Sequence, residues 1–104
     1  MSTIPITSSD RFRLEVLDAG RPVLVDFYAD WCGPCQAMTP ILEQFAKTQS
    51  GTVDVVKVNI DQDAELAASY GVRSIPSLVL FSDGEPVATQ VGVQSLAQLN
   101  QLIQ

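Results

Sequence analysis

The sequence has 104 residues, which fits one compact domain over 1–104 and leaves no room for a second. Hydrophobic residues make up 46% and charged residues 17%, a balance that allows a packed core and excludes intrinsic disorder. Twelve acidic against six scattered basic residues give a net charge of −6, so neither nucleic acid nor an anionic membrane is an expected partner. The sequence contains no histidine, the usual general base and metal ligand.

Targeting signals are not recognisable in the sequence. No run of about eighteen apolar residues is present, so no membrane-spanning helix is predicted. The first ten residues lack the basic, apolar and cleavage-site segments of a signal peptide. We therefore expect a cytoplasmic protein.

The first half of the chain predicts a helix, a buried strand and a second helix. Thr7 with Asp10 three residues later is a helix-start signature, and Gly20 is a natural stop. Residues 23–29 are almost continuously apolar and rich in β-formers, which predicts a strand covered on both faces. The second helix is expected to begin near residues 31–32, with a kink at Pro40.

The second half predicts three strands and two helices. The strands are expected at residues 53–58, 77–81 and 87–91. Asp61 or Asp63 can cap a short helix after the first of these strands, and Pro86 indicates that the last strand lies at a sheet edge. Ser95 with Gln98 forms a capping box that opens the final helix. Strands alternating with helices predict an α/β domain whose mixed sheet is covered on both faces.

Both cysteines lie in the segment Trp31-Cys-Gly-Pro-Cys35, where the buried strand meets the second helix. Positions three apart on a helix are neighbours, at a separation that suits a disulfide. Cys32 in the first turn would meet free N–H groups and the positive end of the helix dipole, which favour a thiolate. Cys35 is expected one turn further in and less exposed, and Pro34 stiffens the ring that the pair closes.

Other interpretations of the cysteine pair remain open at this point. A structural zinc site needs four ligands, so it would require two molecules to share one ion. Haem attachment expects a histidine where Gln36 stands. A static disulfide over so short a loop contributes only about 2 kcal/mol. Reversible thiol–disulfide exchange is therefore the favoured chemistry.

Two further features stand out. Asp26 lies within the apolar strand, where burial raises the pKa of a carboxyl group unless a neighbouring group satisfies it near a strand end. The dipeptide Ile75-Pro76 precedes a predicted strand, and by itself it is most often an ordinary turn with a trans bond.

Several motifs together resemble the thioredoxin family. They are residues 23–35 with the two cysteines, 40–42, 57–61, 70–76, 83–84 and 91–92. The resemblance covers nearly the whole chain in order. It implies the thioredoxin fold, a central mixed five-stranded sheet flanked by four helices. It also implies a protein-disulfide reductase, because the Gly-Pro pair between the cysteines is typical of the reductants in this fold.

The resemblance implies a role for each reacting group. Cys32 attacks a disulfide of a target protein, and Cys35 then resolves the mixed disulfide by closing the redox disulfide Cys32–Cys35. Asp26 accepts the proton of Cys35 through water, and Lys57 modulates Asp26, although Lys57 alone could be a solvated strand residue. No cofactor and no metal are needed, because the two sulfurs hold both electrons. A separate thioredoxin reductase restores the dithiol, and we expect a monomer.

The resemblance further implies an apolar surface for substrate proteins. The Ile75-Pro76 bond would be cis and face the cysteines, leaving the Ile75 backbone free to pair with an extended substrate segment. The residues assigned to substrate binding are Trp31, Gly33, Pro34, Ile75, Pro76, Gly92 and Val93.

Four positions depart from the common family pattern: Tyr28, Gln36, Ser74 and Val93. None removes a reacting group, so they affect partner preference and redox potential rather than the type of reaction. A binding module that uses the same surface without redox turnover is an alternative function. An oxidase or isomerase is a second alternative, and the Gly-Pro pair argues against it.

Overall fold

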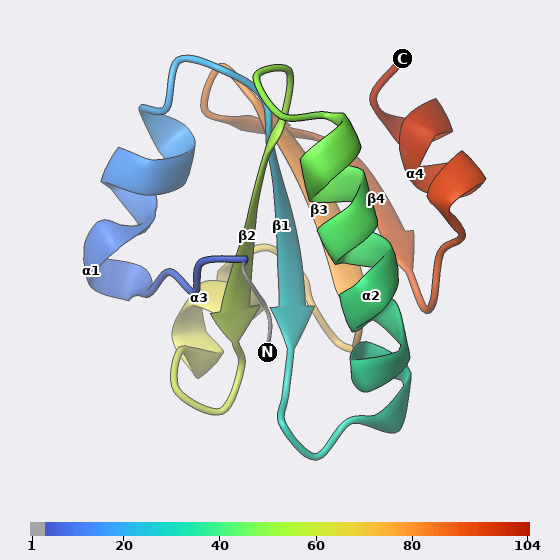
Figure 1. Ribbon diagram of the computed structural model, residues 1–104. Helices are drawn as coiled ribbons and strands as arrows, with labels where there is room; N and C mark the ends of the chain where they lie inside the picture. The colour runs from blue at the N-terminus through green and yellow to red at the C-terminus, as the bar shows by residue number, and fades with distance from the viewer. Residues whose placement is uncertain (1–3) are drawn as a thin grey trace.

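A computed structural model of the chain describes residues 4–104 (Figure 1). Its elements, in chain order, are α1 (Ser9–Phe12) continued by a π-helical segment (Arg13–Leu17), β1 (Val23–Tyr28), α2 (Gly33–Thr48), β2 (Asp54–Asn59), α3 (Ala64–Ser69), β3 (Ser77–Ser82), β4 (Glu85–Val91) and α4 (Leu96–Leu102). No helix within these residues is both long and apolar enough to cross a lipid bilayer.

The strands form one mixed sheet in the order β2-β1-β3-β4. Strand β1 pairs in parallel with β2 and antiparallel with β3, which in turn pairs antiparallel with β4. The expectation of five strands is wrong for residues 4–104, where the sheet has four. The segment before α1 contributes one isolated parallel bridge between Ile6 and Lys57. Pro5 beside it has no N–H to donate, which limits a longer ladder.

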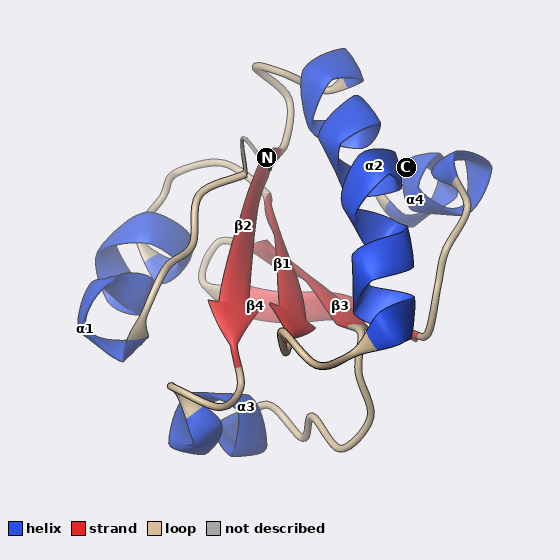
Figure 2. Cartoon of the chain, turned by 60° about the horizontal axis from the view of Figure 1, so that its bottom comes forward, coloured by secondary structure: helices blue, strands red, loops and turns tan. Residues whose placement is uncertain are grey.

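Helices cover both faces of the sheet, as the alternation of elements predicts (Figure 2). Helices α2 and α4 pack on one face, where Leu24 and Leu78 meet Met38, Leu42 and Leu99. The π-helical segment and α3 contribute to a second core on the other face, which surrounds the other side chains of β1. Successive side chains of a strand point to opposite faces of the sheet. Since helices cover both faces, every residue of the central strand β1 is buried.

The short elements show where local patterns succeed and fail. The capping box is confirmed: Gln98 N–H donates to Ser95 Oγ at 3.1 Å, and Ser95 N–H donates to Gln98 Oε1 at 2.8 Å. The edge position of β4, with Pro86 inside it, is also confirmed. Pro40 lies within α2, which continues to Thr48.

The start of the first helix differs from the prediction. Helix α1 has Ser8, not Thr7, at its N-cap position, and no side chain of its own segment caps it. The Asp63 carboxylate supplies the acceptor instead, at 3.1 Å from Ser9 N and 2.8 Å from Ser9 Oγ. Asp63 does occupy the N-cap position of α3, but its side chain makes no capping bond there. The acceptor lies 54 positions away, so a local pattern could not identify it.

Candidate active site

Cys32 and Cys35 form a disulfide where β1 leads into α2, with their Cα atoms 5.2 Å apart. Cys32 is the N-cap residue of α2 in an extended conformation, one position before the first turn in which it was expected. Its sulfur accepts the N–H of Cys35 at 3.1 Å. An N–H and the positive end of the helix dipole both stabilise negative charge on this sulfur, so the position favours a Cys32 thiolate.

The two sulfurs differ in their surroundings more than in their exposure. The exposed fractions are 5% for Cys32 and 4% for Cys35, so burial does not separate their roles. The Cys32 sulfur lies 3.9 Å from the carbonyl oxygen of Ile75. Cys35 instead lines a small pocket on the side of Tyr28 and Lys57. Each sulfur therefore has its own neighbourhood within the same disulfide.

The pocket beside Cys35 has a volume of about 110 Å³. Its lining residues are Tyr28, Ala29, Asp30, Cys35, Gln36, Thr39 and Lys57. A single water needs a cavity of only roughly 10–15 Å³, so this pocket has room for several. Water in this pocket can thus lie beside both Cys35 and Lys57.

Asp26 is buried to 1% exposure in the middle of β1. Within residues 4–104 neither of its carboxylate oxygens has a hydrogen-bond partner, so no neighbouring group satisfies it as the alternative interpretation required. Burial raises the pKa of Asp26 from 3.8 to about 7, and the positive charge of Lys57 acts in the opposite direction. A buried carboxyl group with this pKa can accept and release protons near neutral pH.

Lys57 lies on β2 directly opposite Asp26 in the parallel register. It is 9% exposed, which excludes the interpretation of a solvated strand residue. Its ammonium lies 4.2 Å from the centroid of the Tyr28 ring, a cation–π arrangement. Burial, and next the negative charge of Asp30, raise the pKa of the Tyr28 phenol. Lys57 is thus both the register partner of Asp26 and a lining residue of the pocket beside Cys35.

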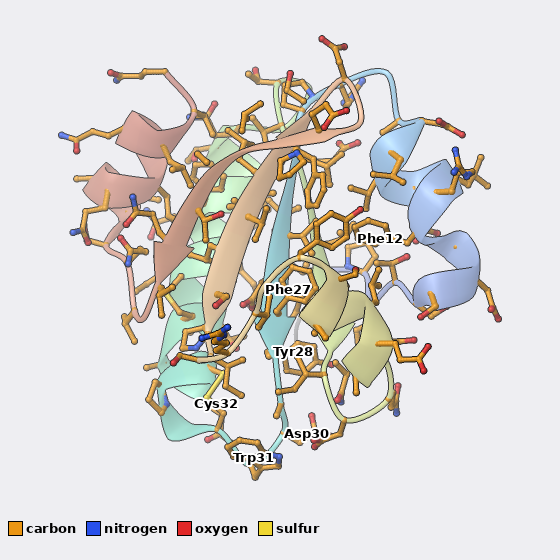
Figure 3. All side chains as sticks on the ribbon, turned by 180° about the vertical axis from the view of Figure 1, so that it is seen from behind. Phe12, Phe27, Tyr28, Asp30, Trp31 and Cys32 are labelled. Carbon is orange, nitrogen blue, oxygen red and sulfur yellow. A yellow bond between two sulfur atoms is a disulfide. The ribbon has the colours of Figure 1, made fainter. Side chains whose placement is uncertain are left out.

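Among the predicted substrate-binding residues, Ile75 has its carbonyl oxygen 3.9 Å from the Cys32 sulfur. The Ile75-Pro76 bond is cis, and Gly92 N–H donates to the carbonyl oxygen of Pro76 at 2.8 Å. Trp31 is 69% exposed and Val93 46% exposed, and Ile75 is half-buried. Figure 3 shows Trp31 and Cys32 together at the end of the sheet where β1 ends.

The remaining members of this set fall into two groups. Gly33 and Pro34 are exposed, so both can contact a bound protein. Pro76 is buried and Gly92 half-buried, so they shape the surface more than they add to its area. Gly92 has a φ of 91°, a conformation that residues with a side chain rarely adopt.

Two residues that sequence analysis did not assign to this surface support it. The Asp61 carboxylate accepts the indole N–H of Trp31 at 2.9 Å. Gln94 is buried, and its side-chain amide donates to the carbonyl oxygens of Val91 and Gly92, each at 3.3 Å. A lone Gln in a loop carries no chemical signature in a sequence, whereas Asp61 was considered only as a candidate helix cap. Among residues 4–104 no cluster of three or more potential ligands could hold a metal ion.

A disulfide between two cysteines three positions apart, at a helix N-terminus, is suited to exchange with other disulfides. The fold and this site together define a thiol–disulfide oxidoreductase of the α/β class.

Comparison with known proteins gives the family. The thioredoxin family model matches residues 3–104. Thioredoxin 1 of Nostoc sp. is 41% identical over 104 residues, which are 100% of this chain and 97% of that relative. Thioredoxin C-2 of Corynebacterium nephridii is 45% identical over 98 residues, covering 94% and 91%. Thioredoxin of Rickettsia felis is 48% identical over 83 residues, covering 80% and 79%.

The chain therefore belongs to the thioredoxin family. It is a protein-disulfide reductase, a thiol–disulfide oxidoreductase whose redox pair is Cys32 and Cys35. Members of the family act on disulfide-containing target proteins and are reduced by a thioredoxin reductase. The structure shows the oxidised form of this pair.

Proposed function

We propose that Cys32 is the attacking thiol and Cys35 the resolving thiol of this reductase. The sulfur of Cys32 lies on the side of Ile75, where a substrate would dock, and it accepts an N–H at the start of α2. Cys35 instead lines the pocket that Lys57 also lines. These different surroundings support the assignment, since the exposed fractions of the two residues do not separate them.

The reaction then has two exchange steps. The Cys32 thiolate attacks one sulfur of the target disulfide, which forms a mixed disulfide and releases the other target sulfur as a thiolate. The Cys35 thiolate attacks the sulfur of Cys32, closes the Cys32–Cys35 bond and releases the second target thiolate. Two electrons pass from the protein to the target, and both target thiolates take up protons at neutral pH.

Asp26 takes the proton of Cys35 before the second step, through water. Two observations support this role. The pKa of about 7 lets the carboxyl group exchange protons near neutral pH, and neither of its oxygens is engaged by another group of residues 4–104. Lys57, opposite Asp26, favours the charged carboxylate and lines the pocket that holds Cys35.

The target docks on an apolar surface beside Cys32. Its members are Trp31, Gly33, Pro34, Ile75, Pro76, Gly92 and Val93. The exposed indole of Trp31 and the exposed Val93 supply contact area. The backbone of Ile75, next to the Cys32 sulfur, is available to an extended segment of the target.

The oligomeric state, the electron donor and the cellular compartment follow from the same chemistry. Both reacting sulfurs belong to one chain, so one molecule suffices, and we propose a monomer in which residues 1–104 act as a single domain. After each turnover this protein receives electrons from a thioredoxin reductase. The Gly-Pro pair between the cysteines is typical of reductants in this fold. It therefore favours action in a reducing cytoplasm, where thiols are kept reduced.

The unpaired buried carboxyl group of Asp26 is the single observation that carries the proposed mechanism. The test is the reduction of a model protein disulfide by dithiothreitol with catalytic amounts of the protein, from pH 6 to pH 9. The wild-type protein should accelerate the reduction, and Asp26→Asn should resolve mixed disulfides more slowly in single-turnover measurements. An Asp26→Asn protein that resolves them at the wild-type rate across this range would remove Asp26 from the mechanism.

A further inference from the structure

The ammonium of Lys57 is buried at a distance from any carboxylate that could form an ion pair with it. Lys57 is 9% exposed and belongs to neither of the two ion pairs found within residues 4–104. Its ammonium lies 4.2 Å from the centroid of the Tyr28 ring. The face of an aromatic ring attracts a cation, so the ring of Tyr28 is a favourable partner for the ammonium. The ring of Tyr28 therefore fixes where the positive charge lies.

The ring itself is firmly held. Tyr28 is the last residue of β1 and is 7% exposed. It packs in a small buried cluster with Ala29 and the two cysteines. Its phenol is hydrogen-bonded to the Asn59 side chain, whose oxygen also accepts the N–H of Asp61 at 2.8 Å. A ring constrained on these sides has little freedom to move. It therefore offers the ammonium of Lys57 a fixed site of attraction.

The position of this charge matters for two groups. Lys57 is the register partner of Asp26, and its charge favours the carboxylate. Lys57 and Tyr28 also line the pocket that contains Cys35. The other charged group that acts on this region is Asp30, which lies at the end of β1 and influences the Tyr28 phenol. A displaced ammonium would weaken its effect on Asp26 and on a Cys35 thiolate together.

We propose that Tyr28 is a positioning residue of the reaction, which holds the Lys57 ammonium beside both Asp26 and the Cys35 pocket. The inference rests on the proposed roles of Asp26 and Cys35 in the resolving step. It assigns a function to one of the positions where this chain departs from the common family pattern. Tyr28 neither contacts the substrate nor takes part in the electron transfer. It acts on the reaction through Lys57.

The test is a double-mutant cycle read out on Asp26, whose titration is followed by carbon NMR of its side-chain carboxyl group in the oxidised protein. Tyr28→Leu removes the ring and should raise the pKa of Asp26 by ~0.5, because the ammonium moves into solvent and a nearby opposite charge is lost. In a Lys57→Met background the same Tyr28→Leu change should leave the pKa of Asp26 unaltered. Tyr28→Phe keeps the ring and should keep the wild-type value.

Equal shifts in the two backgrounds, or no shift in either, would overturn the proposal, since Tyr28 would then act by packing alone or not at all. Phe27→Leu is the matched control: it removes an aromatic ring from the preceding position of β1, in the core on the other sheet face, and should not move the pKa of Asp26. Tyr28→Met serves as a second ringless variant if Tyr28→Leu does not fold, with the same expected shift.

Kinetics separate this inference from the proposed function. In single-turnover resolution of a mixed disulfide, Tyr28→Leu should slow the step several-fold at pH 7 and move its pH profile upward, while Tyr28→Phe should not. If the cycle shows coupling but Asp26→Asn leaves resolution unchanged, the proposed role of Asp26 fails and the contact between Tyr28 and Lys57 stands. If Asp26→Asn slows resolution but the cycle shows no coupling, the inference about Tyr28 fails alone.

Discussion

Burial has opposite effects on stability in the two halves of strand β1. Its first half, residues 23–25, is fully apolar and fills the cores on both faces of the sheet. Its second half contains Asp26, which is equally buried, without a hydrogen-bond partner among residues 4–104. The side chains of Leu24 and Asp26 lie on the same face, two positions apart, because side chains alternate along a strand. One neighbour stabilises the fold, and the other destabilises it whenever it is charged.

This contrast shows how the fold tolerates a destabilising group at a position with a proposed role in the reaction. Desolvation opposes the charged form of Asp26, and the charge of Lys57 offsets only part of this effect. The surrounding core supplies the free energy that keeps the carboxyl group in place. A residue that lowers stability and is still held next to the redox pair is a candidate for function rather than packing.

The largest effect is expected from Asp26→Asn. The pKa of Asp26 is about 7 in the folded protein and 3.8 for an ordinary Asp. The folded state thus holds the proton more tightly, so this group's contribution to stability is greatest below pH 3.8, falls as the pH rises towards 7 and is constant above. The difference between the two pKa values corresponds to about 4 kcal/mol. Asn mimics the protonated acid, so Asp26→Asn should be more stable by about this amount at pH 8.

Denaturant unfolding of the wild-type and Asp26→Asn proteins at several pH values measures this effect. The stability difference should shrink towards zero near pH 4, where Asp26 of the folded wild-type protein is protonated. A difference that stays constant between pH 4 and pH 8 would show that Asp26 does not titrate in this window. The two halves of β1 would then not differ in the way described here.

Leu24→Ala should have the opposite sign and a slightly smaller size. Leu24 is fully buried against α2, so its truncation leaves a cavity and should lower the free energy of unfolding by about 3 kcal/mol. The loss should be the same at pH 5 and pH 8, because no titratable group is removed. The same denaturant series measures it, and a loss that varies with pH would contradict the separation of the two halves.

The smallest effect on stability is expected beyond the end of β1, at Asp61→Ala. This change removes the acceptor of the Trp31 indole N–H on an exposed side chain. The free energy of unfolding should change by no more than about 0.5 kcal/mol, as is typical of exposed polar contacts. The freed indole should raise the KM for a protein disulfide several-fold at unchanged kcat. Steady-state reduction assays check this, and an unchanged KM would show that the orientation of Trp31 does not matter for docking.

The sequence predicts most of the sheet, because its strands are marked by local composition. The unbroken apolar run around Val25 indicates a strand buried on both faces, and Pro86 indicates an edge, as the structure confirms. The first helix is less predictable. Its N-terminal acceptor, Asp63, comes from a distant segment, and its second half is π-helical. Within residues 4–104, the fifth strand implied by the family resemblance is reduced to one isolated bridge at Ile6.

The candidate site also has one part that the sequence predicts and another that it does not. The cysteines are recognisable by their spacing, and Asp26 by its position in an apolar strand. The contact of Lys57 with the Tyr28 ring and the support of the Gly92 loop by Gln94 depend on how distant segments meet. Neither contact has a signature in local sequence, because Gln and Tyr are common in many structural roles. The chemistry was therefore more predictable than the groups that position it.

Trapping the mixed disulfide tests the central claim most directly. The reduced Cys35→Ser variant is mixed with a protein disulfide, and the products are analysed by intact mass and peptide mapping. The account predicts a stable one-to-one adduct joined through Cys32, because the resolving sulfur is absent. A Cys32→Ser variant should give no comparable adduct. An adduct that forms readily through Cys35 in Cys32→Ser, and not through Cys32 in Cys35→Ser, would contradict the account.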